Sequence, residues 1–89
     1  MARVVFTQNI QRHVECPETE ACGGSVREVL DNVFAGNPQA RSYVLDDQAA
    51  LRRHMTVFVD GRAVRDRARL SDPVAAGSTI YVFQALSGG

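Results

Sequence analysis

Lysine is absent from this 89-residue sequence, and all ten of its cationic side chains are arginine. A surface without lysine amines cannot form isopeptide bonds with an activated carboxyl group. A coding bias toward arginine and alanine explains the absence more simply. Excess charge is also absent, because ten acidic residues balance the ten arginines. This balance argues against a nucleic-acid-binding protein, which usually carries a basic excess.

Long apolar runs are missing as well, which excludes a transmembrane helix. The first six residues are largely apolar, but the sequence turns polar soon after them, unlike a secretory signal. We therefore expect a cytoplasmic protein. A chain of this length forms one domain, and 45% hydrophobic residues suffice for one modest core.

Potential metal ligands and cofactor motifs are few. Five residues separate Cys16 from Cys22, a spacing of neither a zinc knuckle nor a CxxC redox motif. Two thiols without a role is the simplest interpretation; a link to another enzyme or a disulfide between chains is the alternative. His13 and His54 lack neighbouring ligands, so no metal site is predicted. No glycine-rich phosphate loop is present, and no bound cofactor is expected.

The clearest local signal is a helix that begins after Ser25. Ser25 and Glu28 have the spacing of a capping box, in which each side chain satisfies a backbone donor of the first turn. Apolar residues then recur at helical spacing and form one stripe: Val26, Val29, Leu30, Val33 and Phe34. Gly36 is expected to end this helix, and the following Asn37-Pro38 pair to prevent a restart.

Strand signals lie on both sides of this helix. Residues 3–7 predict a strand, the polar residues 8–11 a hairpin turn, and either 13–16 or 19–22 the returning strand. Residues 39–53 are irregular and could hold a short helix. Residues 55–60 alternate cleanly, Asp60-Gly61 predicts a tight turn, 62–64 could begin a return strand, and 79–86 predict the last strand.

This order of elements predicts an α+β fold with one main helix packed across a mixed sheet of four or five strands. Hairpins at both ends place the last strand beside the first in the sheet centre, which is the β-grasp, or ubiquitin-like, arrangement. We expect residues 1–86 to form this single domain and residues 87–89 to form a loose tail.

The tail is Ser87-Gly88-Gly89. Glycine loses the most freedom on ordering and has no side chain to pack, so this ending contributes little to a fold. It could instead thread a narrow channel in another protein, and four extended residues reach about 13–14 Å. The carboxylate of Gly89 is therefore the candidate reactive group.

Aromatic residues of the last strand suggest a docking surface. If Ile80 and Val82 point inward, Tyr81 and Phe83 stand on the open face with Phe58, and exposed aromatic clusters often mark contact surfaces. We assign the partner-binding surface to these three and Leu86. The alternative is that residues 39–53 fold over them. We expect the arginines at positions 62, 65, 67 and 69 to lie in a solvated loop. Docking to an acidic partner is the second interpretation.

Three stretches together carry a resemblance that covers the whole chain: residues 24–30 (GSVREVL), 51–61 (LRRHMTVFVDG) and 77–89 (GSTIYVFQALSGG). They resemble the MoaD/ThiS family of ubiquitin-like sulfur carriers. Residues 46–47 and the Leu-Arg-Arg run look more like the molybdopterin-synthase small subunit and CysO-like branch than the shorter ThiS type.

The resemblance implies a carrier and not an enzyme. An E1-like adenylating enzyme would use ATP, with magnesium, to activate the carboxylate of Gly89. Sulfur from a sulfurtransferase or another donor would then produce a thiocarboxylate. The acceptor would be a synthase, such as a molybdopterin-synthase large subunit or a cysteine synthase. The alternatives are a ubiquitin-like protein modifier and a plain interaction domain.

Overall fold

Five strands form one mixed sheet. The computed structural model describes residues 1–84. In chain order the elements are β1 (Ala2–Phe6), α1 (Gln8–Gln11), β2 (Thr19–Ala21), α2 (Val26–Ala35), α3 (Pro38–Val44), β3 (Met55–Val59), β4 (Arg62–Ala63) and β5 (Thr79–Gln84).

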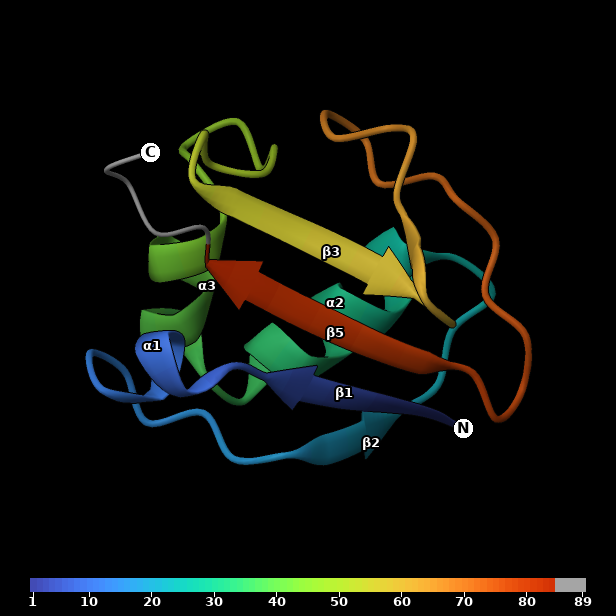
Figure 1. Ribbon diagram of the computed structural model, residues 1–89, viewed down its shortest axis with the longest axis horizontal. Coiled ribbons are helices and arrows are strands. Elements are labelled where there is room, and N and C mark those ends of the chain that lie inside the picture. Colours follow the sequence, from blue (N-terminus) through green and yellow to red (C-terminus); the bar gives the residue numbers. More distant parts are fainter. Residues whose placement is uncertain (85–89) are drawn as a thin grey trace.

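The sheet centre joins strands from opposite ends of the sequence. β5 runs parallel to β1 on one side and antiparallel to β3 on the other. β2 and β4 are antiparallel edge strands. Figure 1 shows the helices behind the sheet and the other face in front, uncovered. This confirms the predicted α+β, β-grasp fold with its last strand beside the first.

The core lies between the sheet and α2. Ile80, Val82, Val4 and Val57 point from the three central strands and are fully buried. The helical stripe meets them as predicted, with four members buried and Val33 packed partly against the core. Each large side chain buried in this way contributes roughly 1.5–3 kcal/mol.

The start of α2 depends on Ser25 and on the residue two places before it. The Ser25 hydroxyl accepts a hydrogen bond from the backbone N–H of Glu28 at 3.2 Å, which satisfies a donor of the first turn. The backbone of Gly23 lies so close to α2 that an added Cβ would be 2.7 Å from the Val29 nitrogen. Glycine is therefore required by space at position 23.

Two predictions about local structure are wrong. Residues 8–11 form the helix α1 and not a hairpin turn, because Ile10 is buried in the core and the Ile10 and Gln11 N–H groups bond to the Thr7 carbonyl. Asn37-Pro38 starts a helix: the Asn37 side chain accepts from the N–H of Ala40, and Pro38 occupies the first turn, where no N–H is needed. The possible short helix after residue 38 is thus α3.

The sheet decides between the two candidates for the second strand and confirms the predicted turn at Asp60-Gly61. Of the two candidates for the second strand, residues 19–21 form β2. Asp60 and Gly61 connect β3 to β4 with φ values of 50° and 87°. Positive φ at both central positions suits the right-handed twist of the flanking strands.

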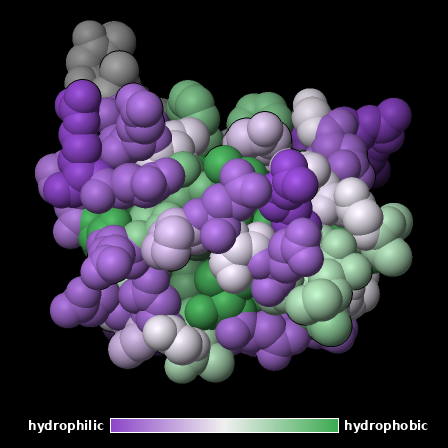
Figure 2. All heavy atoms as spheres, turned by 90° about the horizontal axis from the view of Figure 1, so that it is seen from below, coloured by the Kyte–Doolittle hydropathy of each residue, from purple (hydrophilic) through white to green (hydrophobic). Residues whose placement is uncertain are grey.

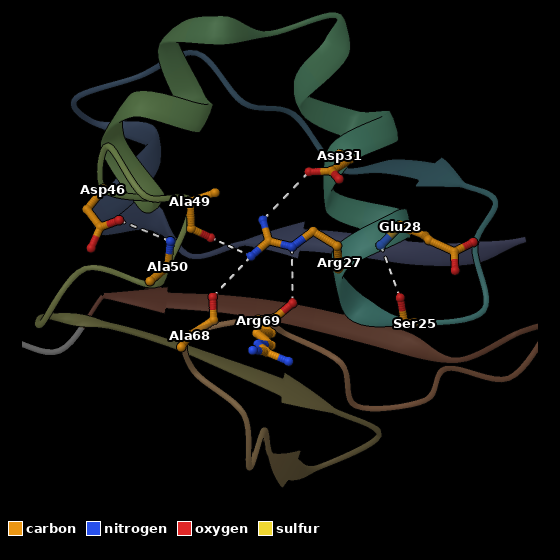
Figure 3. Close-up of polar contacts among 9 residues, drawn as sticks. All are labelled: Ser25, Arg27, Glu28, Asp31, Asp46, Ala49, Ala50, Ala68 and Arg69. Carbon is orange, nitrogen blue, oxygen red and sulfur yellow. Dashed lines mark hydrogen bonds and ion pairs between the residues drawn. The ribbon is translucent and has the colours of Figure 1, made fainter.

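Arg27 of α2 joins two loops that no local pattern connects. Its guanidinium donates to the carbonyl oxygens of Arg69 at 3.1 Å, of Ala68 at 3.2 Å, and of Ala49, while Asp31 lies 3.8 Å away as an ion pair (Figure 3). One side chain thus anchors two irregular segments to the main helix.

The arginine run at positions 62–69 is not simply solvated. Arg62, Arg65 and Arg69 are exposed, but Arg67 is half-buried and donates to the backbone carbonyls of Arg52 and Met55. The solvated-loop prediction is therefore wrong for Arg67, because a planar guanidinium can bind two carbonyl groups at once.

The side of the molecule that carries β2 is mostly hydrophilic, and its hydrophobic areas are separated by polar side chains (Figure 2). None of the helices within residues 1–84 is long and apolar enough to cross a membrane.

Candidate functional site

The open face of the sheet carries an aromatic patch, defined here as Phe58, Tyr81 and Phe83. Tyr81 lies opposite Phe58 on β3 and beside Val5 on β1. Tyr81 and Phe83 are 46% and 45% exposed, whereas their neighbours Ile80 and Val82 are fully buried. The period-two alternation of a strand thus places the aromatic rings on one face and the core residues on the other.

The aromatic patch lines a shallow hollow. Phe58, Gly61, Tyr81 and Phe83 surround a volume of about 310 Å³. The alternative that residues 39–53 fold over these rings is wrong for Tyr81 and Phe83, because α3 packs behind the sheet and both side chains remain exposed (Figure 1). Exposure makes a docking role for this face possible, and that role stays a prediction.

The last described residue of β5 is held from the helix side. The hydroxyl of Tyr43 on α3 donates to Oε1 of Gln84 at 2.9 Å. The ring of His13 stacks on the ring of Tyr43 with centroids 5.6 Å apart. Leu86, Ser87, Gly88 and Gly89 lie outside the described residues, so the proposed reactive carboxylate is placed by the sequence alone.

A second hollow adjoins this contact. It has a volume of about 320 Å³ and is lined by Ser42, Tyr43, Arg52, His54, Met55 and Gln84. We call it the α3 hollow. The sequence analysis missed it, although one signal was available: Gln84 continues the inward-facing series of Ile80 and Val82, where an apolar residue would be expected.

The two cysteines differ in environment. Cys16 is 3% exposed, its thiol donates to the Val14 carbonyl at 3.3 Å, and burial raises its pKa. Cys22 is exposed. Neither belongs to a group of three or more His, Cys, Asp or Glu residues that could hold a metal ion, and residues 1–84 contain no such group.

Three aspartates form hydrogen bonds that fix the loops between β3 and β5. Asp60 accepts from the Thr79 N–H and the Ser78 hydroxyl, which lower its pKa.

The other two aspartates lie in the loop between β4 and β5. The Asp66 carboxylate accepts from the Ser71 hydroxyl and the Arg69 N–H, and the Asp72 carboxylate accepts from the N–H groups of Arg65 and Asp66. These bonds lower both pKa values. All three carboxylates bind backbone, which indicates loop-fixing roles.

The sheet order, the single main helix and the uncovered aromatic face define the class: a ubiquitin-like β-grasp protein. The model of the ThiS family matches residues 4–89, and the chain belongs to this family. The resemblance to the MoaD/ThiS carriers is thereby confirmed. A comparison with curated protein sequences finds no match.

Solved structures share the whole fold. CysO in the BexX/CysO complex of Amycolatopsis orientalis is similar with a TM-score of 0.83 and 24% identity, covering 100% of both chains. Small archaeal modifier protein 1 of Haloferax volcanii gives 0.78 and 24%, covering 99% of this chain and 98% of its own. Mycobacterium tuberculosis CysO, an antigen, gives 0.79 and 18%, covering 97% and 100%. At these identities the likeness concerns the fold.

Proposed function

We propose that this protein is a sulfur carrier whose Gly89 carboxylate cycles to a thiocarboxylate. The observation that carries the proposal is the match to the ThiS family, which extends through Gly89. The sulfur would serve the biosynthesis of a molybdopterin-type cofactor, of cysteine or of a specialised metabolite.

The chemistry requires activation because a carboxylate is a poor electrophile. An E1-like partner would couple the Gly89 carboxylate to ATP, held with magnesium, and release pyrophosphate to give an acyl-adenylate. A sulfide equivalent from a sulfurtransferase or another donor would then displace AMP and leave the thiocarboxylate. We propose the cytoplasm, where ATP is abundant, as the location of this cycle.

The carrier would supply no catalytic side chain to these steps. Within residues 1–84, Arg52 at the α3 hollow already bonds to backbone, and the aspartates between β3 and β5 fix loops. We therefore assign the ATP site and the acid–base groups to the partners: the adenylating enzyme, the sulfur donor and the sulfur-accepting synthase. CysO of Amycolatopsis orientalis, seen in complex with BexX, supports the expectation of a protein partner.

We assign docking to the aromatic patch together with Leu86. Large apolar rings that remain in water are a source of binding free energy when a partner covers them. Phe83→Ser should weaken the partner's affinity at least about fivefold, as expected for a contact residue whose loss costs more than about 1 kcal/mol. The melting temperature should change little, because Phe83 is 45% exposed.

Val82→Ser is the matched control for this variant. Val82 is fully buried on the adjacent position of the same strand, so the hydroxyl would enter the core and lower the melting temperature strongly. If Phe83→Ser destabilised the protein as much as Val82→Ser, the docking assignment would be refuted.

The carrier role is tested by intact-mass analysis of the protein made in its own host. We expect a population in which one oxygen is replaced by sulfur. Deleting Gly89, or adding an affinity tag after it, should abolish this population and leave the melting temperature unchanged. Adenylation of a tagged protein with the tag still attached would overturn the role of the terminus.

A protein modifier is the second candidate, and the similarity to small archaeal modifier protein 1 favours it. The same mass analysis separates the two. Covalent adducts between this chain and other proteins would support a modifier, and sulfur exchange without adducts supports the carrier.

A further inference from the structure

A polar surface lies on the helix side of β5, opposite the aromatic patch. Strand alternation directs Gln84 to the same side as Ile80 and Val82, yet Gln84 is half-buried while they are fully buried. Figure 1 places this strand end beside α3 and the start of β3. The strand therefore ends at the α3 hollow, with a polar side chain in a register that is otherwise apolar.

The wall of the α3 hollow is held in place on two sides. The Tyr43 hydroxyl donates to Gln84 at 2.9 Å. Nε of Arg52 donates to the Ser42 carbonyl at 2.9 Å, which orients the guanidinium at the rim of the hollow. Met55 and the Tyr43 ring supply apolar lining. A hollow with an apolar lining and a fixed cation at its rim suits an apolar side chain beside a carboxylate.

Arg52 and Arg53 give this rim positive charge. Arg52, Arg53 and His54 are consecutive and exposed. The ion pairs found within residues 1–84 are Arg3 with Glu18 and Arg27 with Asp31, so neither arginine of the rim takes part in one. The chain as a whole is neutral, and a partner with negative charge would be attracted to this end of the sheet.

We propose that the α3 hollow, with Arg53 beside it, is a second docking surface that binds an acidic segment of the enzyme acting on the chain terminus. This inference rests on the proposed function. Phe83 and Gln84 are neighbours that face opposite sides of the sheet. An enzyme that binds around the end of β5 therefore contacts both the aromatic patch and the α3 hollow. An apolar side chain of the acidic segment lies on Met55 and Tyr43, and the carboxylates of the segment pair with Arg52 and Arg53.

The test uses a defined probe, the peptide Glu-Asp-Leu-Glu-Glu, titrated into the ¹⁵N-labelled protein at low and high salt. We expect amide shifts concentrated at Tyr43, residues 52–55 and Gln84, and weaker binding at high salt because exposed charges are screened. R53Q, which removes one exposed rim cation, should weaken binding at least about fivefold, as loss of a rim charge does. Arg52 is left in place because it also bonds to Ser42.

The matched control is R62Q, which removes one exposed cation from the opposite end of the sheet. It should leave the peptide affinity unchanged. Equal loss in both variants, or shifts spread over residues 62–65, would show unspecific attraction and overturn the inference.

Sulfur loading in host cells distinguishes this inference from the proposed function. If the wild-type protein carries no sulfur, the proposed function fails, and the peptide titration still judges the surface. If the wild type is loaded and R53E/H54E is loaded equally, the docking surface fails and the carrier role stands. We expect reduced loading of R53E/H54E, normal loading of R62E/R65E, and similar melting temperatures for all three proteins.

Discussion

At the scale of single residues, the labelling rates of the two cysteines measure how often the core opens. Cys22 is exposed and Cys16 is buried, with its pKa raised by burial. A thiol reagent should therefore label Cys22 within its ordinary reaction time. In a Cys22→Ser protein, labelling should be slowed at least about a thousandfold, because Cys16 reacts only when the core opens. Mass spectrometry over time checks this, and equal rates for both thiols would contradict the described burial.

The three loop aspartates predict the acid limb of stability. A carboxylate whose pKa is lowered in the folded state stabilises the fold above its ordinary pKa, and this stabilisation is lost as the pH falls through the lowered value. Asp60, Asp66 and Asp72 all have lowered pKa values. Asp72→Asn should therefore lower the melting temperature at pH 6 and have little effect near pH 2.

Asp47→Asn is the control for that experiment. Asp47 is exposed and accepts no hydrogen bond from residues 1–84, so its replacement should leave the melting temperature unchanged across the same pH range. A wild-type-like acid profile of Asp72→Asn would show that the bonds to Arg65 and Asp66 do not persist in solution.

At the scale of elements, the approach of the loop to α2 is tested by adjacent glycines. A Cβ at Gly23 would meet Val29 and Glu28 at 2.7 to 2.9 Å, whereas one at Gly24 would meet nothing within 4 Å. Gly23→Ala should lower the free energy of unfolding by about 1–3 kcal/mol, as overpacking does. Gly24→Ala should be neutral or slightly stabilising. Urea denaturation measures both, and equal effects would contradict the close approach.

Arg27 makes a second prediction at this scale. Its guanidinium bonds to the carbonyls of Ala49, Ala68 and Arg69, which lie in two separate loops. Arg27→Met should destabilise the fold by about 1.5–3 kcal/mol, the range for hydrogen bonds to a charged group. Arg27→Lys should restore little of this loss, because a single ammonium cannot reach all three oxygens in the plane of the guanidinium.

The elements whose buried faces the sequence predicted are those with a repeating pattern. α2 has a stripe and a cap at Ser25, and β3 and β5 alternate at period two, so their buried faces follow from spacing alone. α1 has four residues and one buried side chain, too few for a period to show. The Asn37-Pro38 pair fits both a break and a first turn, and packing of Ala40 and Val44 against the core decides between them.

The candidate site was predictable to a similar degree. Alternation placed Tyr81, Phe83 and Phe58 together on the open face, whereas the α3 hollow depends on contacts between residues far apart in sequence. The bonds of Tyr43 to Gln84 and of Arg67 to Met55 have no local pattern. The one local indication of the α3 hollow was a polar residue, Gln84, at an inward-facing position of β5.

At the scale of the whole molecule, the sheet depends on β5. All its pairings lie within residues 2–84, and β5 alone connects β1 to β3. A chain ending at Gln84 should keep a cooperative unfolding transition, while one ending at Ser78 should lose it. Circular dichroism during heating compares the two, and cooperative melting of the shorter chain would show that β1 and β3 have another connection.

The same central strand has a consequence during synthesis. β1 leaves the ribosome before its parallel neighbour, because β5 follows every other strand of the described sheet in the chain. Until β5 is made, β1 can pair only with β2 and β3 only with β4, so the two halves of the sheet stay separate. Assembly of the central sheet therefore waits for β5, and a fragment without β5 remains open to chaperones and proteases.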